Sequence, residues 1–229
     1  MRKIIWIIII ICYVGAVEGT TIFDDGEVHD VDYVVQGTID VQDDSFSGDF
    51  TTVNFLPNGM LDWDFHAWDN SQINISGGIM TKTFYAFDNS RITFSDGTIG
   101  AVCACDNSFV DISGGSITDN LRADDNAQII CSGGSIGNEI LAGDLSGGIV
   151  YNSTITFFGS NFAIDGEIVS YGQYFYKDYQ NGRLSGKLAN GDIIDNNFHI
   201  VDGASIILIP EPTTLLLLSL GGLLLRKKH

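Results

Sequence analysis

The chain has 229 residues, of which 45% are apolar, and its 29 acidic and 11 basic residues give a formal charge of −18. This composition can form a folded core, but it lacks the positive surface that nucleic-acid binding requires. The four histidines lie far apart, and the four cysteines match no zinc or thioredoxin spacing. We therefore expect neither a nucleic-acid-binding protein nor an enzyme.

The N-terminus has the pattern of a secretory signal. Two basic residues precede an apolar run over 4–14, and small residues follow it. This order is typical of a signal peptide, here residues 1–19. Cleavage after Ala16 and cleavage after Gly19 fit equally, and an uncleaved membrane anchor is the alternative. We expect the rest of the chain to be exported.

Residues 59–148 contain an internal repeat. Five short segments recur at intervals of 18 or 19 residues, and each has an alanine followed two positions later by an aspartate. The segments begin at Ala67, Ala86, Ala104, Ala123 and Ala142. Between them, polar and apolar residues alternate in runs bounded by Gly-Gly and Asp-Asn, which is typical of strands and turns. A unit this short cannot bury its own apolar face, so we expect the units to stack.

The predicted fold class is all-β: a parallel β-solenoid, or β-helix, with rungs of 18–19 residues. Residues 20–58 are expected to form an irregular N-terminal rung and cap, and residues 149–208 a β-rich C-terminal cap and stalk. The repeat also predicts four inward columns. They are Leu61, Met80, Ile99, Ile117 and Ile136; Phe65, Phe84, Val102, Leu121 and Ile140; the five alanines; and Ile73, Ile92, Val110 or Phe109, and Ile129.

The C-terminus, residues 209–229, combines three features in a fixed order. They are Pro210, Glu211 and Pro212, an apolar stretch over 213–225, and the basic residues Arg226, Lys227 and Lys228. The apolar stretch predicts a short transmembrane helix, and the basic cluster is expected to stop transfer and stay on the cytoplasmic side. A plain tail anchor is the alternative to a sorting signal.

This order resembles the PEP-CTERM sorting signal of bacterial envelope proteins. The resemblance implies processing by an exosortase, a membrane-embedded cysteine transpeptidase, with Pro210, Glu211 and Pro212 as the recognition residues. The family is associated with bacteria that produce exopolysaccharide, which makes exopolysaccharide a second candidate partner. The expected function is that of a non-enzymatic protein of the cell envelope or extracellular matrix, anchored in the membrane only before processing. A polysaccharide-binding or polysaccharide-cleaving β-helix is the alternative.

One aspartate of each repeat is the candidate metal ligand. These residues are Asp69, Asp88, Asp106, Asp125 and Asp144. Stacked carboxylates about 5 Å apart repel one another, and Ca²⁺, which prefers oxygen ligands, would relieve that repulsion. The alternative is a structural one, in which the Asp-Asn pairs form turns and the asparagine side chains bond along the stack. Apart from Ca²⁺, no cofactor is expected.

The cysteines and exposed aromatic residues are weaker candidates. Cys103 and Cys105 are expected on one outer face with their Cα atoms about 7 Å apart, which exceeds easy disulfide reach. Cys131 falls in an apolar column and is expected to be buried. Trp68 and Phe87 have the flat apolar rings that suit a sugar face.

Overall fold

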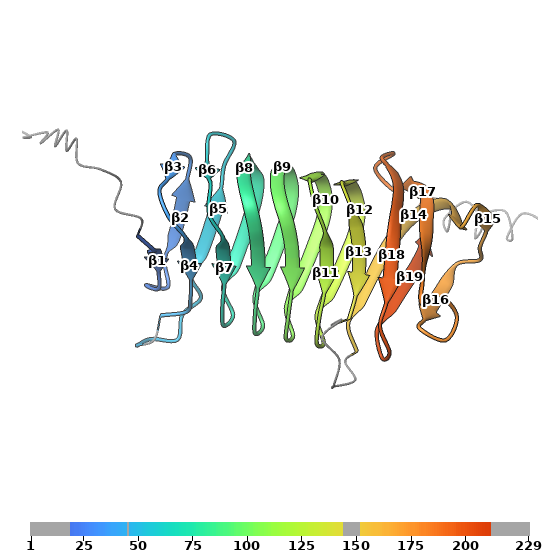
Figure 1. Ribbon diagram of the computed structural model, residues 1–229. Helices are drawn as coiled ribbons and strands as arrows, with labels where there is room; N and C mark the ends of the chain where they lie inside the picture. The colour runs from blue at the N-terminus through green and yellow to red at the C-terminus, as the bar shows by residue number, and fades with distance from the viewer. Residues whose placement is uncertain (1–18, 45, 144–151, 212–229) are drawn as a thin grey trace, which may run out of the picture.

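The structure, a computed structural model, describes residues 19–44, 46–143 and 152–211. Within these ranges it consists of nineteen strands that are hydrogen-bonded into one sheet, without a helix. Figure 1 shows the strands side by side along one axis, from the blue N-terminal strands to the red C-terminal ones. In the described part of the chain, no helix is long and apolar enough to cross a membrane.

The N-terminal rungs are built from short strands. These are β1 (Thr21–Phe23), β2 (Val28–Val31), β3 (Val34–Val35), β4 (Ile39–Val41), β5 (Thr52–Phe55), β6 (Met60–Leu61) and β7 (Phe65–Ala67). Each of the first four pairs in parallel with the strand three places later, so that one rung carries three strands. Residues 20–58 therefore span more than one rung, and the expected single irregular rung is wrong. The separation in sequence between β4 and β5 lengthens the spacing here, which hides the repeat.

The central rungs follow the repeat. Their strands are β8 (Gln72–Ala86), β9 (Arg91–Ala104), β10 (Phe109–Ile117), β11 (Leu121–Ala123), β12 (Gln128–Ile136) and β13 (Glu139–Ala142). Neighbouring rungs pair in parallel, with Leu61 opposite Met80 and Ala67 opposite Ala86. The same columns continue through β9 and β11 to β12 and β13. The column assignments are thus confirmed, because each side chain packs on its counterpart one repeat away.

The interior is one continuous apolar core. The five alanines of the repeat are completely buried, so their column lies inside the stack. Val110, rather than Phe109, pairs with Ile92 in the inner column. Cys131 is 1% exposed, between Ile112 and Phe157 of the adjacent rungs, as expected for a small apolar residue. Complete burial of one large aliphatic side chain stabilises the fold by about 1.5–3 kcal/mol.

The C-terminal strands overturn the predicted fold class. They are β14 (Thr154–Ile164), β15 (Glu167–Ile168), β16 (Gly172–Phe175), β17 (Asn181–Leu188), β18 (Ile193–Ile200) and β19 (Ser205–Pro210). Strands β18 and β19 extend the parallel ladders of β13 and β14. Strand β17 instead lies antiparallel to both β14 and β18, β15 is antiparallel to β14, and β16 to β19. The sheet is mixed, so the predicted parallel β-solenoid with a C-terminal helix is wrong for this chain.

Two glycine-containing turns form antiparallel hairpins, β14–β15 and β17–β18. Asp165 and Gly166 have φ values of 52° and 85° and join β14 to β15 in a two-residue hairpin. This conformation, with φ positive at both positions, reverses the chain and favours Asp-Gly and Asn-Gly. Asn190 and Gly191 lie in the turn between β17 and β18, where Gly191 has a φ of 103°. The predicted transmembrane helix over 213–225 lies outside the described residues, and the described fold contains no helix.

The turn at Asn190 is attached to the side of the stack. Asp192 accepts hydrogen bonds from the backbone N–H of Gly134, at 2.7 Å, and from the amide of Asn190, at 2.6 Å. The backbone N–H of Asn190 donates to the carbonyl of Ser132 at 2.9 Å. A side chain at Gly133 would collide with Asn190, since an added Cβ would lie 2.1 Å from its amide nitrogen. The β17–β18 hairpin is therefore docked against β12.

Candidate functional site

The repeated aspartates form a ladder of turns along one edge of the stack. The residues Asp69, Asp88, Asp106 and Asp125 have φ values of 56°, 54°, 55° and 53°. Aspartate tolerates this left-handed conformation better than most residues. The Oδ2 atom of each later aspartate accepts a hydrogen bond from the backbone N–H of the aspartate one rung earlier, at 3.1 Å. The column therefore satisfies backbone donors that the turn would otherwise leave free.

The neighbouring asparagines bond along the same edge. The amide nitrogen of Asn89 donates to the amide oxygen of Asn70, at 3.4 Å. Asp88, Asp106 and Asp125 each use one carboxylate oxygen for a backbone contact, and Ca²⁺ at this ladder stays a prediction. The fifth candidate, Asp144, lies outside the described residues.

The sorting motif begins where the folded sheet ends. Pro210 is the last residue of β19 and pairs with Gly159 of β14. The next residue, Glu211, accepts a hydrogen bond from the hydroxyl of Ser160, at 3.3 Å. No extended linker therefore separates the sheet from the first two motif residues. Pro212 and the basic residues 226–228 lie outside the described part of the chain.

The aromatic candidates form a small outer cluster. The rings of Trp68 and Phe87 stack with centroids 4.1 Å apart and an interplanar angle of 13°. Tyr85 lies parallel to Phe87 at 5.7 Å, and His66 contacts all three rings. Sugars bind to the free faces of aromatic rings. These rings stack on one another along the rungs. We therefore interpret the cluster as packing between surface side chains rather than as a sugar-binding site.

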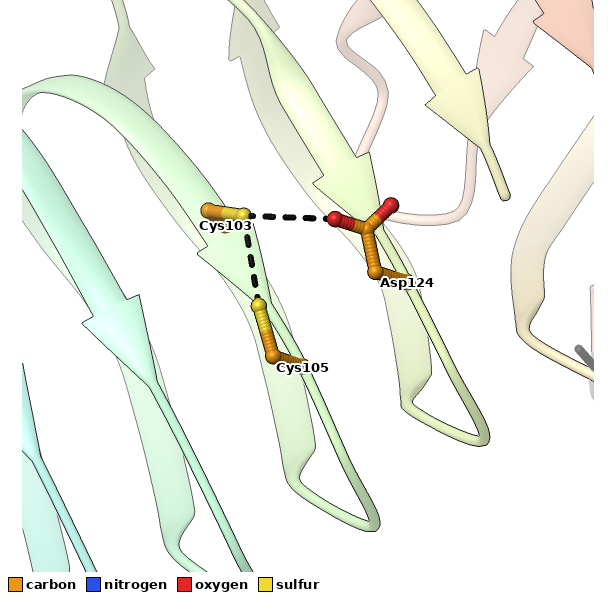
Figure 2. A group of neighbouring side chains, drawn as sticks. All are labelled: Cys103, Cys105 and Asp124. Carbon is orange, nitrogen blue, oxygen red and sulfur yellow. Dashed lines mark hydrogen bonds between the residues drawn. The ribbon is translucent and has the colours of Figure 1, made fainter. Parts of the chain in front are cut away.

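Two thiols and a carboxylate meet on the same outer face, next to the aromatic cluster. The sulfur atoms of Cys103 and Cys105 lie 3.5 Å apart, and the Cys103 sulfur lies 3.9 Å from Oδ2 of Asp124. Figure 2 shows the two sulfur atoms facing each other, with Asp124 pointing toward Cys103 from the next rung. All three ligand atoms lie within 4.8 Å of one another. We call these residues the Cys-Asp cluster.

The surroundings of the Cys-Asp cluster are largely buried and contain one cation. Cys103 is 9% exposed and Asp124 7%, whereas Cys105 is half-buried. The Nε atom of Arg122 lies 2.8 Å from the Asp124 carboxylate. The hydrogen bond with Cys103, followed by burial, raises the pKa of the Cys105 thiol well above its ordinary value. Cys105 is therefore a protonated, weakly nucleophilic thiol at neutral pH.

The sequence does contain a signal for this cluster, in the column next to the repeated alanine. A search for cysteine motifs by their spacing does not find it. The position after that alanine holds Trp68, Phe87, Cys105 and Asp124 in successive copies. Cys105 and Asp124 are thus one rung apart in the same column, and Cys103 lies opposite Arg122. The expected separation of the cysteines referred to their Cα atoms. The side chains turn toward each other, which brings the sulfur atoms to 3.5 Å.

The comparisons with known proteins returned no relative. No protein-family model matches the chain, and neither does a curated protein or a solved structure. The resemblance of the C-terminus to PEP-CTERM proteins stays a prediction.

Proposed function

We propose that this chain is an exported, non-enzymatic protein of the bacterial cell envelope or extracellular matrix, delivered to an exosortase by its C-terminus. The observation that carries the proposal is the end of the sheet at Pro210, the first residue of the Pro-Glu-Pro motif. A processing enzyme needs a substrate segment that can leave the fold. Cleavage beyond β19 would release the tail and leave every described strand in place.

The contacts of the motif suit a recognition element that rests on the fold. Pro210 lacks a backbone N–H, so it ends the hydrogen-bonding pattern of β19. The contact between Glu211 and the Ser160 hydroxyl is partly buried, and one hydrogen bond of this kind contributes about 0.5–1.5 kcal/mol. An enzyme that binds Glu211 would have to replace this hydrogen bond. The motif is therefore held near the sheet without being buried in it.

The charge of the exported part suits an extracellular matrix. Residues 20–209 contain 27 acidic and six basic residues, a net charge of about −21. Such a chain stays soluble and repels acidic polysaccharide unless divalent cations bridge the two. We propose a passive structural role on this basis, with no catalytic residue assigned.

The test is the mass of the mature protein in a bacterium that expresses an exosortase. We expect the wild-type chain to lack Arg226–His229 and to end near residue 210, and Glu211→Ala to keep the intact C-terminus. Ser160→Ala is the matched control, because it removes the same hydrogen bond but leaves the motif unchanged. We expect Ser160→Ala to be processed normally. An intact Arg226–His229 terminus on wild-type envelope material would overturn the proposal.

A further inference from the structure

We propose that the Cys-Asp cluster binds one divalent cation of the zinc class. The cluster supplies two sulfur atoms and one carboxylate oxygen from two adjacent rungs. Its function is independent of the sorting proposal, since none of its residues lies near the C-terminal motif in the sequence. The spacing of the ligand atoms, their chemistry and the rigidity of their backbone each support metal binding.

The spacing of the ligand atoms matches a tetrahedral zinc site. Zinc lies about 2.3 Å from thiolate sulfur and about 2.0–2.2 Å from carboxylate oxygen. Tetrahedral angles then require about 3.8 Å between the two sulfur atoms and about 3.5 Å between sulfur and oxygen. The observed separations are 3.5 Å between the sulfur atoms and 3.9 Å from Cys103 to Asp124. The Cys105 sulfur and the Asp124 carboxylate lie within 4.8 Å of each other, so side-chain rotation has to shorten this separation for all three atoms to reach one ion.

The ligand set selects the kind of metal. Thiolates favour zinc-class ions, whereas Ca²⁺ and Mg²⁺ take oxygen ligands. Binding would replace the protons of Cys103 and Cys105, so that one M²⁺ enters and two H⁺ leave. The two thiolates then balance the ion, and Arg122 balances Asp124. The charges of the ion and of these four side chains then sum to zero, which suits the burial of Cys103 and Asp124.

The backbone holds the ligands in place before the metal arrives. Cys103 pairs with Arg122 in the ladder between β9 and β11. The N–H of Cys105 donates to the carbonyl of Ala86 at 2.8 Å, and the N–H of Asp124 donates to the carbonyl of Ala104 at 2.7 Å. Arg122 orients the carboxylate from outside, as the hydrogen-bonding partners of metal ligands generally do. The half-buried Cys105 provides the access route, and solvent supplies the fourth ligand.

The experiment titrates the untagged full-length protein with Co²⁺, and then Zn²⁺, in the presence of a phosphine reductant. Cobalt bound to thiolate gives a near-ultraviolet charge-transfer band, so the spectrum reports the ligands directly. We expect one ion per chain, displacement of Co²⁺ by Zn²⁺, and no response to Ca²⁺. Cys103→Ser and Cys105→Ser should each abolish the band. Asp124→Asn should weaken binding at least about tenfold, since even residues that only orient a ligand change affinity by about 10–100-fold.

The control is Cys131→Val, which removes the third described thiol from the core and leaves the Cys-Asp cluster intact. We expect this variant to bind as the wild type does, and melting curves establish that each variant is folded. Absence of a thiolate band in the reduced wild type would overturn the proposal. Loss of binding in Cys131→Val would also overturn it. An unchanged affinity in Asp124→Asn would do the same.

Discussion

The carboxylate of Asp106 accepts a hydrogen bond from the backbone N–H of Asp88, one rung earlier, at 3.1 Å. Both residues have a left-handed backbone, with φ values of 55° and 54°. The aspartate therefore has two structural roles. It tolerates the left-handed backbone, and its carboxylate accepts a hydrogen bond from the rung before. Its charge strengthens the hydrogen bond that it accepts, but the neighbouring carboxylates of the ladder repel that charge.

We predict opposite effects for two substitutions of Asp106. Asp106→Asn keeps an acceptor oxygen and a residue that tolerates positive φ, while it removes a repelling charge. Its melting temperature should equal or exceed that of the wild type at low salt. Asp106→Ala loses the hydrogen bond and strains the turn, and should cost about 1–2 kcal/mol of unfolding free energy.

Thermal melts at low and high NaCl measure both variants. The gain of Asp106→Asn should shrink as salt screens the repulsion. A destabilised Asp106→Asn would contradict the turn role and show that the charge itself is needed. Repeating the melts in millimolar Ca²⁺ and in NaCl of equal ionic strength tests the calcium prediction, which requires a larger effect of Ca²⁺ on the wild type.

A column of buried serines predicts a stabilising substitution. The hydroxyl oxygens of Ser71, Ser90, Ser108 and Ser153 are buried without a hydrogen-bond partner. A buried polar group without a partner costs about 1–3 kcal/mol. We expect Ser90→Ala to raise the free energy of unfolding by about 1 kcal/mol, measured by urea titration. The same column already contains an alanine, Ala127, which is fully buried.

Ser205→Ala is the matched control for this prediction. Ser205 is equally buried, but its hydroxyl accepts a hydrogen bond from the amide of Gln173 at 2.9 Å. Its removal loses this hydrogen bond and should lower stability by about 1 kcal/mol. If both alanine variants shift the urea midpoint in the same direction, satisfaction of the hydroxyl is not what distinguishes the two sites.

The alanine column predicts a strong dependence on side-chain volume. Ala104 is fully buried between Ala86 and Ala123 of the adjacent rungs. Ala104→Leu overpacks this column and should cost about 1–3 kcal/mol. Asn74→Ala, at an exposed position whose amide bonds to Asn54, should cost less than about 1 kcal/mol. Equal shifts in melting temperature would contradict the observed difference in burial.

Asp192 predicts a pH-dependent attachment of the β17–β18 hairpin. The amide of Asn190, and then the N–H of Gly134, hold the pKa of Asp192 below its usual value. A lowered folded-state pKa means that this stabilisation is complete above about pH 4 and is lost as pH falls through the folded-state pKa. The melting temperature of Asp192→Asn should therefore lie below that of the wild type at pH 6. The difference should shrink as the pH falls below about 4.

The control for Asp192 is the exposed Asp202, whose substitution by asparagine should leave the melting temperature nearly unchanged at both pH values. Hydrogen exchange at Gly134 gives a local reading, because this N–H is the donor to Asp192. We expect faster exchange in Asp192→Asn at pH 6. An exchange rate equal to that of the wild type would show that the hairpin stays docked without the charge.

The ladder of the central rungs could be predicted from residue spacing. Equivalent residues recur every 18 or 19 positions, and a stack buries its apolar columns only when like positions lie opposite one another. The spacing places Ala104 between Ala86 and Ala123, as the structure does. It does not reach the C-terminal strands, where the repeat is lost. There the turns at Asp165-Gly166 and Asn190-Gly191 reverse the chain, and the sheet becomes mixed.

The Cys-Asp cluster depended on the tertiary structure. The spacing places Cys105 and Asp124 in one column, but whether two side chains meet is decided by their rotamers and by the depth at which the rung buries them. The Cys103 and Cys105 sulfur atoms approach to 3.5 Å because the two side chains turn toward each other beside the Arg122–Asp124 pair. Periodicity determines which residues are neighbours, since it fixes the backbone register. Side-chain direction and burial determine what those neighbours can bind.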